Sequence, residues 1–292
     1  MSTPVPTLPA ATSMGPVRLR VADLDRSAAF FDRAIGLREL SREGSEALLG
    51  TGDGRVIVEL EGDADAPLRP PRTTGLFHLA ILVPTRADLA LALRRVAAAG
   101  WSFTGASDHL VSEALYLDDP EGNGIEIYRD RPRDEWRRGA DGELEMGTFA
   151  LDLPGVLGAA SEGTPDEGMP DATTMGHVHL QVRDVPEADA FYSGLLGFEP
   201  TVRGYPGALF VSAGGYHHHL GLNTWGTRDA PPPPPGARGL ARYRIELPTT
   251  GDLSALAARL DAEGVPAERR DGGVEIVDPS GNRALVEAVG RE

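Results

Sequence analysis

HVHLQVRDVPEADAFYSGLLGF, residues 177–198, closely matches an earlier stretch of the same chain, PVRLRVADLDRSAAFFDRAIGL at residues 16–37. The same offset brings ALLG, which starts at residue 47, opposite ALFV, which starts at residue 208. Both long stretches begin with alternating apolar residues, typical of a strand with one buried face. They continue with apolar residues three and four apart, typical of an amphipathic helix. The sequence therefore contains a tandem duplication.

A second pair of related stretches follows the same pattern. Residues 78–101, HLAILVPTRADLALALRRVAAAGW, match residues 242–265, RYRIELPTTGDLSALAARLDAEGV. Further along, DDPEGNGIEIY at 118–128 matches VDPSGNRALVE at 277–287. Two or three short strands follow each predicted helix, separated by turns that carry Gly, Asp and Pro. The repeated unit is thus β-α-β-β-β, and four such modules predict an α+β fold.

The repeats divide the chain into two halves of two modules each. We expect the halves at residues 14–130 and 173–290. The polar segment 131–172, which is rich in Gly and Pro, is expected to be the linker. Residues 1–13 have the composition of a disordered leader.

The composition excludes several classes of function. The 292 residues include no cysteine, so any metal must be bound by His, Asp, Glu or backbone oxygen. A net charge of −16 argues against nucleic acid as a partner, since phosphate recognition needs clustered cations. No apolar run approaches the roughly 20 residues of a membrane span. The N-terminal residues lack the pattern of a secretory signal, so we expect a cytoplasmic protein.

The modules and their motifs resemble the vicinal oxygen chelate superfamily of glyoxalase I, bleomycin-resistance proteins and extradiol ring-cleaving dioxygenases. The resemblance is carried by VADLDRSAAFF at 21–31, VRDVPEADAFY at 182–192 and DPEGNGIEI at 119–127. It is closest to the extradiol enzymes similar to catechol 2,3-dioxygenase. The resemblance implies two vicinal oxygen chelate domains, in which paired modules form curved mixed sheets around a cupped site. It also implies that metal ligands come from the first and last strands of the paired modules.

The superfamily's ligand positions hold His or Glu only in the second and third modules, as His78, Glu126 and His177. The matching positions of the first and fourth modules hold Pro16, Arg242 and Leu285. Only a pairing of module two with module three gives a complete ligand set. This crossed pairing resembles single-chain glyoxalase I and differs from the usual extradiol enzymes. Two histidines and one carboxylate form the facial triad of non-haem Fe(II), with Mn(II) as the alternative ion.

Three consecutive histidines raise the question of which one serves the site. Extradiol enzymes carry an acid/base histidine on the last strand of the third module, and HHLGL places His218 there. Neighbouring strand residues face opposite sides, so His217 and His219 should point away from the cup. Histidine suits proton transfer because its pKa lies near the operating pH.

Further pocket residues follow from the resemblance. Tyr116 lies ten residues before Glu126, the spacing found in extradiol enzymes, and His109 matches a histidine shortly before that tyrosine. The resemblance implies that Tyr116 forms a hydrogen bond with the metal-bound substrate oxygen, with His109 behind it. His179 lies two residues after His177 on the same face of the strand, so it would contact substrate or O2.

These expectations combine into an Fe(II)-dependent extradiol dioxygenase that opens the ring of a catechol-type diol with O2. The partners would be a small aromatic diol and O2, with no nucleic acid and no membrane, and the chain could form a homo-oligomer. One alternative is a metal-free protein that sequesters an aromatic ligand, as bleomycin-resistance proteins do. Another is a metal-dependent lyase or isomerase of the glyoxalase type. The glyoxalase alternative is weakened, because glyoxalase I would offer a second carboxylate ligand and residues 217–220 contain no Asp or Glu.

Overall fold

The structure, a computed structural model, describes residues 6–140, 142–160, 163–270 and 272–290. The expected α+β fold of four β-α-β-β-β modules is confirmed. The second module consists of β6 (Gly75–Leu82), α2 (Arg86–Ala98), β7 (Phe103–Asp108), β8 (Ser112–Asp118) and β9 (Gly124–Asp130). The third consists of β11 (Thr174–Gln181), α4 (Val185–Asp189) with η4 (Ala190–Leu195), β12 (Glu199–Val202), β13 (Ala208–Ser212) and β14 (Leu220–Asn223).

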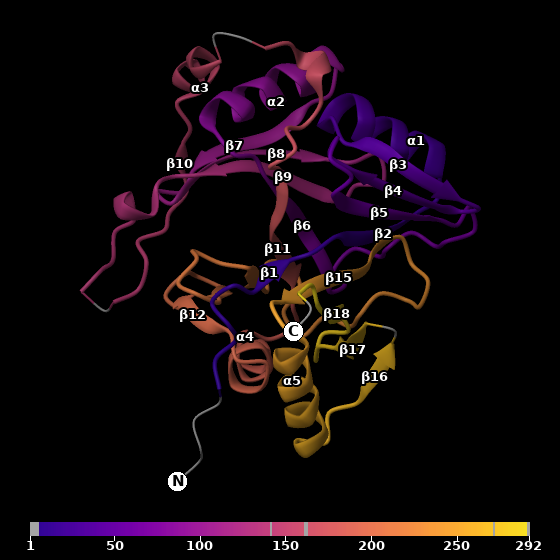
Figure 1. Ribbon diagram of the computed structural model, residues 1–292, viewed down its shortest axis with the longest axis vertical. Coiled ribbons are helices and arrows are strands. Elements are labelled where there is room, and N and C mark those ends of the chain that lie inside the picture. The colour runs from indigo at the N-terminus through magenta and orange to yellow at the C-terminus, as the bar shows by residue number, and fades with distance from the viewer. Residues whose placement is uncertain (1–5, 141, 161–162, 271, 291–292) are drawn as a thin grey trace.

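The first and fourth modules have the same order of elements. The first consists of β2 (Val17–Val21), α1 (Leu24–Phe30) with η1 (Phe31–Ile35), β3 (Arg38–Glu43), β4 (Glu46–Gly50) and β5 (Val56–Gly62). The fourth consists of β15 (Gly239–Leu247), α5 (Thr250–Ala262), β16 (Ala267–Arg270), β17 (Gly273–Val277) and β18 (Arg283–Ala288). In Figure 1, α1 and α2 lie at one end of the molecule and α4 and α5 at the other. No helix in the described part of the chain is long and apolar enough to span a bilayer.

Side-chain caps set where the helices begin. Asp23 is the N-cap of α1, and its side chain accepts a hydrogen bond from the backbone N–H of Arg26. Thr85 and Thr249 start α2 and α5 with capping boxes, in which an aspartate three residues later closes the reciprocal bond. Such caps satisfy backbone N–H groups that have no partner within the helix. The helices therefore start at the positions that the repeated motifs mark.

The strands form two sheets, and each sheet takes one module from each half of the chain. One sheet has the order β10-β7-β8-β9-β6-β11-β14-β13-β12, where β10 is Phe149–Ala150. The other sheet has the order β16-β17-β18-β15-β2-β5-β4-β3. Modules two and three meet where β6 and β11 pair antiparallel, and modules four and one meet where β15 and β2 pair antiparallel. The expected pairing of module two with module three is thus confirmed.

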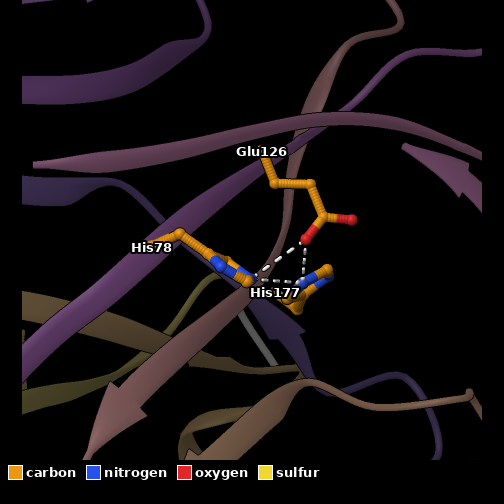
Figure 2. Close-up of side chains that lie close together, drawn as sticks. All are labelled: His78, Glu126 and His177. Atoms are coloured by element: carbon orange, nitrogen blue, oxygen red, sulfur yellow. Dashed lines mark hydrogen bonds and ion pairs between the residues drawn. The ribbon is translucent and has the colours of Figure 1, made fainter. Parts of the chain in front are cut away.

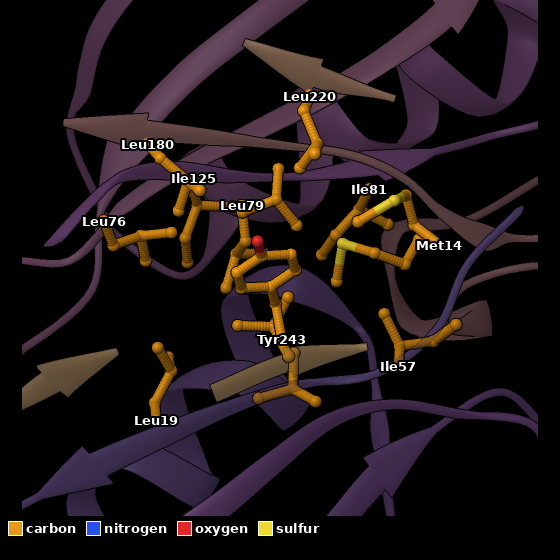
Figure 3. Close-up of a cluster of buried hydrophobic side chains, with 14 of the residues drawn as sticks. Met14, Leu19, Ile57, Leu76, Leu79, Ile81, Ile125, Leu180, Leu220 and Tyr243 are labelled. Atoms are coloured by element: carbon orange, nitrogen blue, oxygen red, sulfur yellow. The ribbon is translucent and has the colours of Figure 1, made fainter. Parts of the chain in front are cut away.

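Alternation along the central strands separates the site from the core. On β6, Leu79 and Ile81 pack into the main hydrophobic cluster, whereas His78 lines a pocket on the opposite face. Leu180 on β11 joins the same cluster, together with Tyr243 of the other sheet (Figure 3). Because side chains alternate along a strand, one face of this sheet builds the core and the other is left for function.

The N-terminal segment differs from the expected disordered leader of residues 1–13. Residues 1–5 lie outside the described residues. Leu8 is buried, and its backbone N–H donates to the carbonyl of Gly197. The chain then forms β1 (Ser13–Met14), which pairs with β15. Apolar burial and strand pairing thus order a segment whose composition suggested none.

The expected linker of residues 131–172 is also partly ordered. It contains η2 (Arg133–Glu135), β10 (Phe149–Ala150), α3 (Leu153–Ala159) and η3 (Pro165–Glu167). β10 extends the second module's sheet beside β7, and α3 packs against α2. Both halves of the chain contribute strands to both sheets. The domain boundaries expected at 14–130 and 173–290 therefore stay a prediction that describes the sequence repeat.

Candidate metal centre

Three side chains converge on one point in the cup of the second and third modules. His78 of β6, Glu126 of β9 and His177 of β11 have ligand atoms that lie within 4.8 Å of one another, and all three side chains are buried (Figure 2). Glu126 Oε2 lies 3.0 Å from His78 Nε2 and 3.2 Å from His177 Nε2. The two Nε2 atoms are 3.4 Å apart. The sequence-predicted ligands are thus brought together from three adjacent strands.

The spacing of these three atoms fits a divalent metal. Two ligands bound at about 2.1 Å and at right angles are about 3.0 Å apart, and at a tetrahedral angle about 3.4 Å apart. The observed separations of 3.0 to 3.4 Å lie in that range. Two imidazoles and one carboxylate would therefore occupy three neighbouring positions of a metal and leave others open. This donor set suits Fe(II), Mn(II) and similar borderline ions.

Burial and the neighbouring charges keep Glu126 and His177 in the forms that bind metal. Burial alone would raise the pKa of Glu126, but the facing His177 and His78 outweigh it and hold that pKa well below its usual value. Burial lowers the pKa of His177 to about 4, against the opposing effect of Glu126. At neutral pH, Glu126 is therefore a carboxylate and His177 is a neutral imidazole.

Packing sets the orientation of the His177 ring. Its Nδ1 is buried without a hydrogen-bond partner among the described residues. The ring packs instead against Tyr128 at 4.8 Å and His218 at 4.1 Å between centroids. Gly176 makes room for this contact, because a Cβ there would lie 1.8 Å from the Tyr128 hydroxyl. The glycine next to the ligand is therefore required by close approach.

Tyr116 and His109 form a hydrogen-bonded pair beside the cluster. The carbonyl of Gly147 lies 2.7 Å from His109 Nδ1 and can only accept, so Nδ1 carries the proton. His109 Nε2 then accepts from the Tyr116 hydroxyl at 2.6 Å. Burial, with the nearby Glu126 charge, raises the pKa of Tyr116 well above its usual value, so this residue remains a phenol. Both residues line the pocket.

His179 lines the pocket on the other side of His78. The two rings are 4.9 Å apart, and His179 Nε2 is buried with no partner in the described part of the chain. Burial, reinforced by His78 and His177, holds the pKa of His179 well below its usual value. Gly221 permits this ring position, since a Cβ there would lie 2.8 Å from the imidazole.

The three consecutive histidines do not lie in a strand, which corrects the expectation. They precede β14, which begins at Leu220. The three side chains nevertheless point in the expected directions. His218 lines the pocket, whereas His217 and His219 do not. His217 turns toward Asp130, and His219 Nδ1 accepts from the backbone N–H of Ala213 at 3.1 Å. Local turn geometry, rather than strand alternation, separates the three side chains.

The cup opens into a pocket of about 370 Å³. Much of its wall is aromatic and comes from residues that sequence reasoning missed: Phe77, Tyr205, Phe210 and Trp225. Met146, Gly147 and Thr148 of the expected linker also line it. These three residues lie in a polar stretch with Gly, in which no sequence pattern indicated a functional site.

Comparison with known proteins agrees with the geometry. The family model described as "Glyoxalase/Bleomycin resistance protein/Dioxygenase superfamily" matches residues 13–127 and 174–285. The chain belongs to this superfamily. It is 44% identical over 271 residues to the catechol-2,3-dioxygenase of Bacillus subtilis (strain 168), covering 92% of this chain and 94% of that one.

Solved structures of the superfamily fold are also similar. A crystal structure of a Bacillus subtilis protein matches with a TM-score of 0.65 at 14% identity, covering 97% of this chain and 86% of that one. Glyoxalase I from Zea mays matches with a TM-score of 0.58 at 17% identity, covering 95% and 92%. At these identities the likeness supports the fold alone.

The second superfamily cup, between modules one and four, has a different content. Glu59 is buried there and forms ion pairs with Arg18, Arg242 and Arg244. Arg242 also approaches Glu275 at 4.0 Å. Among the described residues, the His–Glu–His cluster of the first cup is the group with metal-ligand spacing. This cup thus contains a network of ion pairs.

Proposed function

We propose that this chain is an Fe(II)-dependent extradiol dioxygenase that cleaves the ring of a catechol-type diol with O2. The observation that carries the proposal is the buried set of His78, Glu126 and His177 at the bottom of an aromatic pocket. The 44% identity to a catechol-2,3-dioxygenase supports the same reaction and substrate class. Mn(II) is the alternative ion for this donor set.

A bound Fe(II) would supply adjacent positions for the diol and O2 and allow charge to pass between them. The chain's own residues orient the diol. The aromatic wall, with Phe77 and Trp225, excludes water and stacks along the ring of the substrate. The Tyr116 hydroxyl donates its hydrogen bond to His109, so its oxygen is free to accept a hydrogen bond from a substrate hydroxyl.

His218 is the proposed acid/base residue. It lines the pocket beside His177, and its Nδ1 is engaged by His217, which leaves Nε2 for the substrate. Burial, reinforced by His177 and His217, lowers the pKa of His218 well below its usual value. The ring is therefore neutral at physiological pH and can accept a proton from a diol hydroxyl before returning one later. His179 would contact substrate or O2 from the opposite side.

The test is metal analysis of anaerobically purified protein followed by an assay with catechol. We expect about one equivalent of iron per chain, O2 consumption and a yellow ring-cleavage product. Catechol binding without bound metal or O2 uptake would instead indicate a sequestration protein. Metal without O2 uptake would point to the lyase or isomerase class.

A further inference from the structure

Behind His218, a line of hydrogen bonds leads away from the pocket. His218 Nδ1 lies 2.7 Å from His217 Nδ1, and His217 Nε2 lies 2.9 Å from Asp130 Oδ1. Asp130 is the last residue of β9, the strand that carries Glu126. The His217 side chain is fully buried, whereas that of Asp130 is 26% exposed. The line thus connects a pocket residue with a carboxylate near solvent.

The Asp130 carboxylate at the outer end of this line of hydrogen bonds decides which ring nitrogens carry protons. A carboxylate has only acceptor atoms, so Asp130 holds a proton on Nε2 of His217. A neutral His217 then has a lone pair on Nδ1, which requires the proton of the short bond to sit on His218 Nδ1. A neutral His218 of that form has its lone pair on Nε2. Asp130 and His217 therefore hold His218 in the form that accepts a proton.

We propose that Asp130 and His217 are positioning residues that relay a proton behind His218, an inference that rests on the proposed dioxygenase function. When His218 Nε2 takes the proton of a substrate hydroxyl, the proton on His218 Nδ1 moves to His217 Nδ1. His217 becomes an imidazolium paired with the Asp130 carboxylate, and His218 stays neutral with its proton on Nε2. The reverse shift accompanies the later donation by His218, so one proton is stored between the two steps.

The surroundings favour this placement of charge. The His218 ring lies 4.1 Å from that of His177 and 4.9 Å from that of Phe210. A cation at His218 would be buried without an anion in hydrogen-bond contact, which is costly. On His217 the same charge lies beside Asp130. The relay therefore moves positive charge from an unpaired to a paired position.

The relay is held rigidly. The Thr201 hydroxyl donates to the backbone carbonyl of His217 at 2.6 Å. The Trp136 ring packs against the His217 ring at 5.4 Å. The Tyr216 hydroxyl donates to Asp130 Oδ1 at 3.2 Å, which fixes the carboxylate. Three side chains thus hold His217 and Asp130, neither of which lines the pocket.

The kinetic test separates relay from simple positioning. In His217→Asn, the amide oxygen can still accept a hydrogen bond from His218 Nδ1, but it cannot become protonated. We expect kcat/KM for catechol to fall about 10- to 100-fold in this variant and in Asp130→Asn, with iron content and KM nearly unchanged. With 4-nitrocatechol, whose more acidic hydroxyl is largely ionised before binding, the loss should be clearly smaller.

The matched control is His219→Asn, which keeps an acceptor for the Ala213 N–H and has no bond to His218. It should retain wild-type kcat/KM on both diols. Wild-type rates in His217→Asn and Asp130→Asn would overturn the relay. So would an equal loss on both diols, or a loss matched by His219→Asn, because each result indicates a structural role only.

A second measurement does not depend on turnover, so it stands even if the wild type fails to cleave catechol. Histidine ¹⁵N NMR of full-length protein loaded with diamagnetic Zn²⁺ reports which ring nitrogen carries each proton. We expect a neutral His217 protonated on Nε2 and a neutral His218 protonated on Nδ1, with Asp130→Asn weakening the preference. The opposite protonation at His217 would refute the proposal.

Discussion

Single residues set the chemistry of the cup through their protonation states. Glu126 stays ionised because two histidines face it, and burial keeps His177 neutral with a pKa of about 4. These shifts extend both forms to lower pH, since an exposed glutamate and histidine would titrate near 4.3 and 6.5. For Glu126 the cause is the closeness of the two histidines on adjacent strands, and for His177 it is burial.

Replacing any metal ligand should abolish metal binding without unfolding the protein. We expect His78→Ala, Glu126→Ala and His177→Ala each to lose most bound iron, because a facial site with two remaining ligands binds weakly. Metal content per folded chain, with circular dichroism to check the fold, measures this. The matched control is Leu285→Ala, at the equivalent position of the fourth module, which should keep its metal. Full iron in His177→Ala would contradict the ligand assignment.

His218→Ala should separate catalysis from metal binding. Its ring lines the pocket but lies outside the three-ligand cluster, so iron content should stay at the wild-type level. Turnover should fall by about 10²–10⁴, the usual contribution of a positioned proton-transfer group. Iron stoichiometry and kcat are measured on the same samples, with His219→Ala as the neighbouring control. Loss of iron together with activity would make His218 a ligand instead.

At the scale of elements, the first and last strands of each module determine what the two cups contain. In one cup, β6, β9 and β11 present the metal cluster. In the other, β5 presents Glu59 to arginines of β2 and β15. The segment around β10 closes the first cup, and its Gly147 carbonyl holds His109. The same strand framework thus supports a candidate metal site in one cup and an ion-pair network in the other.

The pocket wall predicts a preference among substituted catechols. No Arg or Lys lines this pocket in the part of the chain that the structure describes, while Asp118 and Glu126 do. Burying a carboxylate without a partner is unfavourable, so carboxylated catechols should have at least about tenfold lower kcat/KM than methylcatechols. Steady-state kinetics on both sets test this, and Thr148→Arg should narrow the difference. Equal rates for both sets would show that the substituent lies outside the aromatic wall.

The ion pairs of the second cup should matter for stability only. Glu59→Leu leaves three arginines without their shared carboxylate, and we expect a loss of about 1–3 kcal/mol in the free energy of unfolding. Iron content and kcat should be unchanged, because the first cup lies in the other sheet. Urea denaturation alongside metal analysis makes the comparison. A drop in metal binding in this variant would reveal coupling between the cups.

At the scale of the whole molecule, burial of histidines makes stability depend on pH. Burial lowers the pKa of His177 to about 4 and that of His219 to about 3, and it lowers those of His179 and His218 as well. The unfolded chain, with values near 6.5, binds more protons below that pH than the folded chain does. Stability should therefore be complete above about pH 6.5 and decline as the pH falls toward 4.

This acid sensitivity can be measured on metal-free protein. Each neutral buried imidazole should reduce the free energy of unfolding by up to about 1.4 kcal/mol per pH unit within that window. Urea midpoints at pH 7 and pH 5 give the slope. His219→Asn, which removes one such group, should show a shallower decline. A midpoint that does not change between the two pH values would contradict the expected protonation states.

Local sequence patterns, together with the superfamily resemblance, were enough to predict the modules and the candidate metal ligands. Period-two and helical patterns are local, and a repeated motif marks equivalent positions. With the ligand positions implied by the superfamily resemblance, His78, Glu126 and His177 could be chosen against Pro16, Arg242 and Leu285. The pairing of module two with module three also followed, because only that combination completed a ligand set.

Only the tertiary structure decided the rest. The ordered N-terminal segment, the linker residues in the pocket wall and the bond from His217 to Asp130 all join residues far apart in the chain. The histidine run shows the limit clearly: strand alternation was the wrong premise, because a turn before β14 places the rings. Turns, linkers and polar contacts have no periodic signature. Their conformation is selected by the partners that packing brings to them, which no local pattern encodes.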